Sequence, residues 1–173
     1  GAALGSVTQI GPLVTVLIVA GAGATAICAD LGARTIREEI DAMRVLGIDP
    51  VHRLVVPRVV ASCLVALLLN GMVVAIGLVG GFYFSVYVQN VTPGAYVSSL
   101  TLVTGLPEVI LSEVKAGLFG LIAALVASYR GLTVSGGPKG VGTAVNETVV
   151  YAFVALFAVN VVLTAVGVKV TAG

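Results

Sequence analysis

VVASCLVALLLNGMVVAIGLVGGFYFSVYV, residues 59–88, is the stretch that decides the fold. It contains no charged residue, and its apolar run is broken only by glycines, two serines and Asn70. Because a helix rises about 1.5 Å per residue, about 20 residues cross the roughly 30 Å hydrocarbon core of a bilayer. The stretch exceeds that length, which predicts a membrane-crossing helix whose outer end leaves the bilayer near the aromatic residues Phe82, Tyr83 and Tyr87.

Three further apolar stretches predict crossings on either side of this one. Residues 10–29 are almost uninterrupted apolar and small residues, residues 107–129 open with a proline suited to a first helical turn, and residues 148–168 form the last. The expected fold is an all-α integral membrane protein with four transmembrane helices in a single domain over residues 1–173.

The composition agrees with lipid as the main solvent. The chain is 58% hydrophobic and 10% charged, whereas a soluble domain carries about 25% charged residues. Its 9 Lys and Arg and 8 Asp and Glu nearly cancel, so no strong basic field exists to attract nucleic acid. The cysteines Cys28 and Cys63 are both expected at the cytoplasmic side, where a disulfide is not favoured.

The distribution of basic residues predicts the orientation. Five arginines lie between the first two crossings, Arg130 and Lys139 lie between the last two, and residues 82–106 carry no charge. By the positive-inside rule the two basic loops are cytoplasmic, and both ends of the chain face outward. We expect an N-terminal portion to precede the chain, and one more crossing there would give five in the full protein.

The segment TIREEIDAMRVL, residues 35–46, differs from everything around it. Thr35 and Glu38 match a capping box, Gly47 suits the left-handed residue after a helix end, and Pro50 prevents continuation. These signals predict a short amphipathic cytoplasmic helix. Its apolar face is Ile36, Ile40 and Met43, and its polar face is Arg34, Arg37, Glu38, Asp41 and Arg44.

Two interpretations of this amphipathic helix stay open on physical grounds. It could lie in the lipid headgroups, supported by Arg34–Glu38 and Arg37–Asp41 ion pairs, or it could dock on a cytoplasmic partner protein. Interfacial helices that bind anionic lipid are rich in Lys and Arg, whereas this one carries as many acids as bases. The charge balance therefore favours a protein partner.

Small residues predict close helix packing. Ala116, Gly120 and Ala124 recur every four residues, and residues 20–26 read AGAGATA. Such spacings allow helix backbones to approach one another closely in lipid. We therefore expect these helices to pack against others in this chain or in a partner.

Several sequence motifs of this chain resemble those of a known family. The stretch REEIDAMRVLGIDP, residues 37–50, followed by LVVPRV at residues 54–59, resembles the signature of the MlaE/YrbE permeases. The segments at residues 113–120, 129–132 and 136–142 are also similar to that family, most of all to its actinobacterial Mce-operon branch. These permeases are membrane subunits of ABC transporters that move lipids together with Mce-domain proteins.

The resemblance implies a role for residues 35–46 as a coupling helix that contacts a separate cytoplasmic ABC ATPase. It also implies five crossings in the full protein, a location in a bacterial inner membrane, pairing with a second YrbE-type permease, and work with Mce-domain proteins. The implied substrate is a membrane lipid, and the implied direction is import. The expected coupling residues are Ile36, Arg37, Glu38, Glu39, Ile40, Asp41, Met43 and Arg44.

A second group of candidates lies within the apolar stretches. Glu108, Ser112 and Lys115 fall on one face of the third crossing, while Glu113 points elsewhere. Charges inside a membrane helix are expensive, so their default interpretation is functional, here the polar entrance of a lipid path. The alternative is that Lys115 snorkels to the interface or pairs with a neighbouring helix. Asn70, also a lipid-path candidate, is expected to form an interhelical hydrogen bond.

Asn160, in the fourth crossing, is expected to form an interhelical hydrogen bond as well. The nucleotide-binding motif G-x-x-x-x-G-K-[ST] does not occur in the sequence. ATP and Mg²⁺ would therefore bind a partner ATPase, and this chain is not expected to be an enzyme. His52 and the two cysteines lack the spacing of a metal site, and we expect no metal or cofactor in this chain. An ion-driven secondary transporter or channel, and a non-transporting scaffold, remain the alternative functions.

Overall fold

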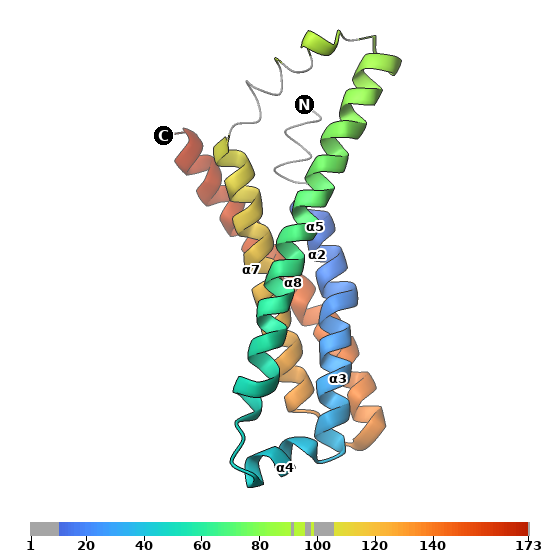
Figure 1. Ribbon diagram of the computed structural model, residues 1–173, viewed down its shortest axis with the longest axis vertical. Coiled ribbons are helices and arrows are strands. Elements are labelled where there is room, and N and C mark those ends of the chain that lie inside the picture. Colours follow the sequence, from blue (N-terminus) through green and yellow to red (C-terminus); the bar gives the residue numbers. More distant parts are fainter. Residues whose placement is uncertain (1–10, 91, 96–97, 99–105, 173) are drawn as a thin grey trace.

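The computed structural model describes residues 11–90, 92–95, 98 and 106–172, and the elements named below lie in that part of the chain. They are helical throughout, with short π-helical stretches (η) joined to α-helices (Figure 1). The elements are α2 (Gly11–Ile18), η2 (Val19–Ala24), α3 (Thr25–Ile36), α4 (Glu39–Val45), η3 (Val51–Val55), α5 (Val56–Tyr83), η4 (Phe84–Val88), α7 (Leu106–Leu132) and α8 (Gly137–Ala172).

Among the described residues, three helices are long and apolar enough to cross a membrane: Val51–Val88, Val109–Leu132 and Gly137–Lys169. They correspond to the crossings predicted at 59–88, 107–129 and 148–168, but the first of them begins earlier and the last begins at Gly137. The stretch predicted as crossing 10–29 is helical from Gly11 to Ile36, and its membrane crossing stays a prediction.

The early start of α8 has a local cause. Gly136 and Gly137 have φ angles of +86° and +70°, which turn the chain sharply after α7. Pro138 follows in the first helical turn, where the missing N–H costs nothing. The glycine-rich segment therefore starts a helix of 36 residues and is not a long loop.

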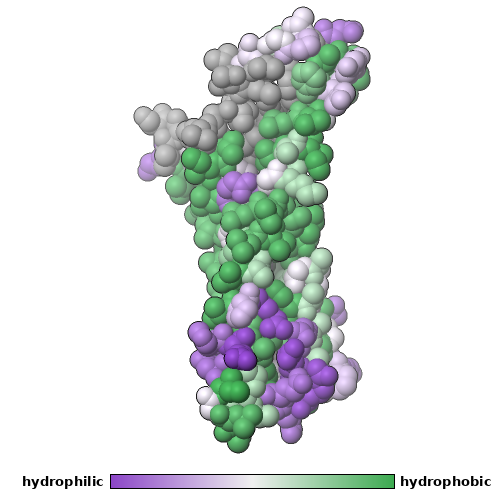
Figure 2. All heavy atoms as spheres, in the orientation of Figure 1, coloured by the Kyte–Doolittle hydropathy of each residue, from purple (hydrophilic) through white to green (hydrophobic). Residues whose placement is uncertain are grey.

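The helices form an elongated bundle in which α7 packs on α5 and α8, and α3 packs on α7 and α8 (Figure 1). Away from the α4 end, α5 diverges from α7 and α8. The buried core consists largely of alanines, with Phe119 and Leu156 as its large side chains. Figure 2 shows that the middle of the visible face of the bundle is apolar, as expected of helices that face lipid.

The predicted close packing of small residues is confirmed in α7. Ala116 and Ala124 are fully buried, and a Cβ added at Gly120 would lie 2.7 Å from the Ser62 carbonyl oxygen of α5. The Ser62 hydroxyl donates a 3.0 Å hydrogen bond to the Gly120 carbonyl at the same crossing. Gly131 plays the equivalent part against α3, because a Cβ there would lie 2.8 Å from Cβ of Leu31.

The predicted helix over residues 35–46 is wrong at its start. Thr35 belongs to α3, and its hydroxyl donates to the carbonyls of Leu31 and Gly131 and caps nothing. Glu38 adopts a left-handed conformation with φ 63°, and α4 begins one residue later. The predicted capping box does not form, because α3 continues through Ile36 and the chain then turns sharply.

The predicted end of this helix is confirmed. Gly47 has a φ of +79°, its N–H donates to the Arg44 carbonyl, and the Ile48 N–H donates to the Met43 carbonyl at 2.8 Å. This pair of bonds is a Schellman motif, which satisfies the last carbonyls of α4 and turns the chain toward η3.

Candidate functional sites

The α4 end of the bundle carries a short helix with a buried side and an exposed side. Ile40 is 3% exposed and Met43 is half-buried, so both face the bundle. The apolar side chains that face outward are instead Val45, 86% exposed, and Leu46, 74% exposed. Ile36 lies in α3 and not in α4. The predicted apolar face of Ile36, Ile40 and Met43 is therefore not an exposed face of one helix.

The charged side chains of this segment form local ion pairs that differ from those expected. Arg37 pairs with Glu39 at 3.4 Å and Arg44 pairs with Asp41 at 3.3 Å, all with exposed side chains. The predicted Arg34–Glu38 and Arg37–Asp41 pairs require one continuous helix, which the turn at Glu38 interrupts. These exposed pairs contribute little to stability and remain available to a partner.

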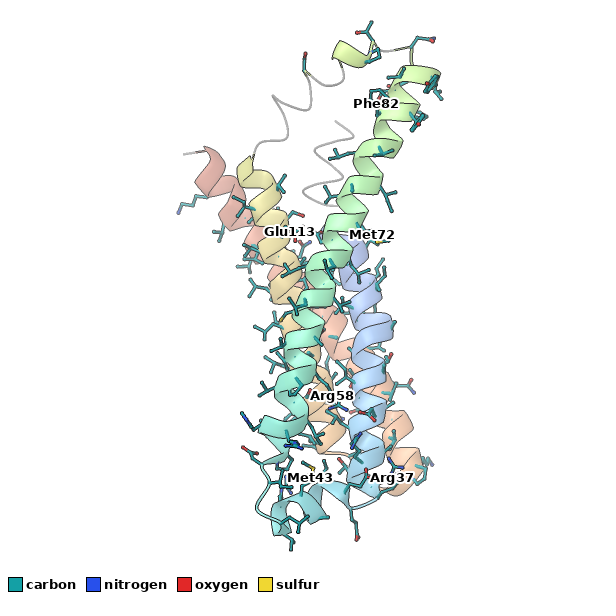
Figure 3. All side chains as sticks on the ribbon, viewed as in Figure 1. Arg37, Met43, Arg58, Met72, Phe82 and Glu113 are labelled. Carbon is teal, nitrogen blue, oxygen red and sulfur yellow. The ribbon has the colours of Figure 1, made fainter. Side chains whose placement is uncertain are left out.

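Asp30 is a functional candidate that sequence reasoning missed. It lies in α3 and pairs with Arg34 at 3.5 Å and with Arg58 of α5, whose guanidinium also donates to the Leu54 carbonyl at 2.9 Å. The i, i+4 spacing of Asp30 and Arg34 was a signal for the first pair, but only the packing of α3 on α5 creates the second. Figure 3 labels Arg58 above Met43 and Arg37, toward the α4 end.

The turn between α7 and α8 lies at the same end. Arg130 pairs with Glu147 of α8, and its guanidinium carbon lies 5.5 Å from the Tyr151 ring centroid. The two basic stretches of the sequence therefore meet at one end of the bundle, where Figure 2 shows hydrophilic residues gathered. This agrees with the prediction that both basic loops lie on one side of the membrane.

A second polar site lies in the apolar part of the bundle. The Asn70 side-chain amide of α5 donates to Oγ of Ser112 at 2.9 Å and to Oε1 of Glu113 at 3.1 Å. The interhelical hydrogen bond predicted for Asn70 is confirmed. Ser112 and Glu113 of α7 thus share one partner, whereas the sequence placed Glu113 on another face.

The geometry around Glu113 leaves room for its carboxylate. Gly71 lies beside it, since an added Cβ there would be 3.6 Å from Oε1 of Glu113. Asn70 is fully buried and Glu113 is half-buried. Figure 3 labels Glu113 facing α5 at the height of Met72, and Figure 2 shows hydrophilic atoms within the apolar band at that height.

Lys115 is separate from this pair. Its ammonium donates a 2.7 Å hydrogen bond to Oγ1 of Thr164 in α8, and the side chain is 1% exposed. The structure thus supports pairing with a neighbouring helix and not snorkelling. The Glu108 side chain lies outside the described residues. Oδ1 of Asn160 is buried and has no hydrogen-bond partner in the described protein. The interhelical hydrogen bond predicted for Asn160 is therefore not supported by its side-chain oxygen.

The part of the chain that the structure describes contains no metal site or disulfide. No group of three His, Cys, Asp or Glu side chains is placed to hold a metal ion there. Cys28 is buried and Cys63 half-buried, and both are free thiols. Long apolar helices, an alanine core and charge gathered at one end together define a multi-pass integral membrane protein.

Comparison with known proteins identifies its family. The model of the family "Permease MlaE" matches residues 1–166. The chain is 33% identical over 156 residues to a probable ABC transporter permease protein of Synechocystis and 35% identical over 158 residues to one of Rickettsia typhi. It is 27% identical over 165 residues to the intermembrane phospholipid transport system permease protein MlaE of Haemophilus influenzae.

The chain belongs to the MlaE permease family of ABC transporter permeases. The matches cover 90%, 90% and 95% of this chain in the order given, but 59%, 60% and 63% of the relatives' own lengths. The chain therefore spans less than two thirds of each of these relatives.

Proposed function

We propose that this chain is the membrane permease subunit of an ABC-type lipid transporter that uses ATP hydrolysed on a separate cytoplasmic subunit. The observation that carries the proposal is a short, exposed, charged helix at the basic end of a membrane bundle in an MlaE-family chain. Under the positive-inside rule that end faces the cytoplasm of a bacterial inner membrane. A cytoplasmic ATPase would meet α4 there.

The surface of α4 supports a protein contact. Its exposed acids Glu38, Glu39 and Asp41 lie at the start of the segment, and the exposed apolar pair Val45 and Leu46 lies at its end. Exposed apolar side chains together with charged ones are typical of protein interfaces. We therefore assign the apolar contact to Val45 and Leu46, with Arg37 and Arg44 at the rim.

The packing behind α4 supports transmission of movement into the bundle. Thr35 at the end of α3 donates to the Gly131 carbonyl of α7 at 3.0 Å, and Gly131 itself packs tightly on Leu31. A displacement of α4 would thus act on α3 and α7 together. In our proposal the helices then rearrange and change the size of a lipid cavity where two permeases meet.

The substrate class is inferred from one relative's name and from the sequence resemblance. One relative is named as a phospholipid transport permease, and residues 37–50 resemble the Mce-operon branch. We propose a membrane lipid, namely phospholipid, fatty acid or sterol, as the cargo, import as the direction, and a second YrbE-type permease and Mce-domain proteins as partners. Of the lipid-path candidates, Glu113 is half-buried and keeps part of its side chain exposed, whereas Lys115 is buried and donates to Thr164.

The test is co-purification of the full-length protein with its candidate ATPase, together with ATP turnover. Charge reversal at Glu38, Glu39 and Asp41, or Leu46→Asp, should abolish association and stimulated turnover. Reversal of the exposed Lys139 at the same end, outside α4, is the matched control and should change neither. Unchanged association in both α4 variants would contradict the coupling role. Lipid movement that does not depend on ATP would favour an ion-driven transporter.

A further inference from the structure

A groove of about 430 Å³ lies between the first helical stretch and α5. Its walls are apolar, with Ile18 and Ile27 on one side and Val65 and Leu69 on the other. On α5 the lining extends from Arg58 to Leu69, about 16 Å at 1.5 Å per residue. The groove thus extends along α5 between apolar walls, as binding of a hydrocarbon chain requires.

One end of the groove is charged. Among the described residues that line it, Arg58 is the only ionisable one, and it lies on the side of α4. The other polar side chain there, Ser62, already donates to the Gly120 carbonyl. A ligand in the groove would therefore place its polar group against Arg58.

The charge at this end is unbalanced. Asp30 is shared between Arg34 and Arg58, so two guanidinium groups face one carboxylate in this cluster. Nε of Arg34 lies 3.5 Å from Oδ1 of Asp30, so this one carboxylate is the shared counter-ion of both guanidinium groups. An anionic group would complete the cluster, since guanidinium groups bind phosphate and carboxylate with charge-assisted hydrogen bonds.

The wall formed by η2 explains why space exists there. Gly23 lines the groove, and a Cβ added to it would have no atom within 4 Å. The glycine therefore serves no packing contact within the described protein. π-helical turns such as η2 are frequent at functional sites because they displace the local backbone.

We propose that this groove binds one lipid with an anionic phosphate headgroup, drawn from the leaflet on the α4 side, with a hydrocarbon chain along α5 and the headgroup at Arg58. The inference does not rest on the proposed function, because it concerns binding of a lipid in this groove whether or not the subunit transports lipid. It requires neither ATP nor transport.

Native mass spectrometry of the full-length protein in detergent tests it, with dioleoyl phosphatidylglycerol and dioleoyl phosphatidylcholine as probes. The wild-type protein should bind phosphatidylglycerol about tenfold more tightly than phosphatidylcholine, the scale of a charge-assisted contact. Equal affinity for the two lipids would overturn the proposal. sn-Glycerol 3-phosphate should not compete, and competition by it would overturn the lipid assignment.

Two independent variants locate the binding. Gly23→Leu should fill the groove and remove phosphatidylglycerol binding, while Gly21→Leu should not, because Gly21 has equal free space but lies outside the lining. Arg58→Gln should abolish the preference for phosphatidylglycerol, and Arg53→Gln, an exposed arginine outside the groove, should keep it. Wild-type binding by folded Gly23→Leu, or equal losses in both glycine variants, would refute the site.

Discussion

The ammonium of Lys115 in α7 donates a 2.7 Å hydrogen bond to Oγ1 of Thr164 in α8, and the lysine side chain is 1% exposed. This bond lies within helices long and apolar enough to cross a membrane. A charged group there is expensive and is retained only with polar partners. The bond therefore joins α7 and α8 by a second polar contact, in addition to the Arg130–Glu147 pair at the α4 end.

Replacement of Thr164 by valine should destabilise the protein by about 1–3 kcal/mol, because the buried lysine loses its acceptor. Lys115→Met should cost less, since it removes the charge at similar volume. The double variant should therefore be no less stable than Lys115→Met alone. Unfolding in mixed micelles measures this cycle, and strictly additive effects would contradict the pairing.

Gly120→Ala should destabilise the α5–α7 crossing by about 1–3 kcal/mol through overpacking. The added methyl would meet the Ser62 carbonyl at 2.7 Å and Cβ of Ala66 at 2.9 Å, neither of which can move alone. Gly117→Ala is the matched control on the same helix, since its nearest neighbour is the flexible Leu67 side chain at 3.4 Å. Thermal unfolding should separate the two, and equal melting temperatures would contradict the close crossing.

Glu113→Gln should leave the fold within about 0.5 kcal/mol of the wild-type protein, because the amide oxygen can still accept from Asn70. If the carboxylate lines the lipid path, lipid transport by the assembled complex should nevertheless fall by about tenfold, the scale of one lost charge interaction. Val114→Ala, at the next position of the same helix and with an exposed apolar side chain, serves as a control with normal transport. Full transport by folded Glu113→Gln would limit this residue to helix packing.

Glu38→Gly should stabilise the protein by about 1 kcal/mol, because a left-handed conformation costs an L-residue about that much and glycine nothing. Glu38 has a φ of 63° at the turn between α3 and α4. Glu38→Ala keeps the strain and removes the same carboxylate, so it is the comparison variant. A stability ranking with alanine equal to glycine would show that the turn relaxes in solution.

Several features followed from the sequence alone, because each depends on local patterns. Apolar length predicted the membrane-length helices, and small residues four apart predicted the tight α7 packing at Gly120. A glycine after an amphipathic segment predicted the left-handed end of α4 at Gly47. Periodicity, length and turn chemistry are properties of neighbouring residues, so no tertiary contact was needed to read them.

Only the tertiary structure decided which polar groups meet. Asp30 and Arg58 are 28 positions apart, and Asn70 and Ser112 are 42 apart, so their pairing depends on how α3, α5 and α7 pack. The predicted start of α4 was wrong for the same reason. Thr35 donates a hydrogen bond to the Gly131 carbonyl, a contact across 96 positions that local capping rules do not include. Helix packing selects these partners because a buried polar group must find whatever donor or acceptor the neighbouring helix presents.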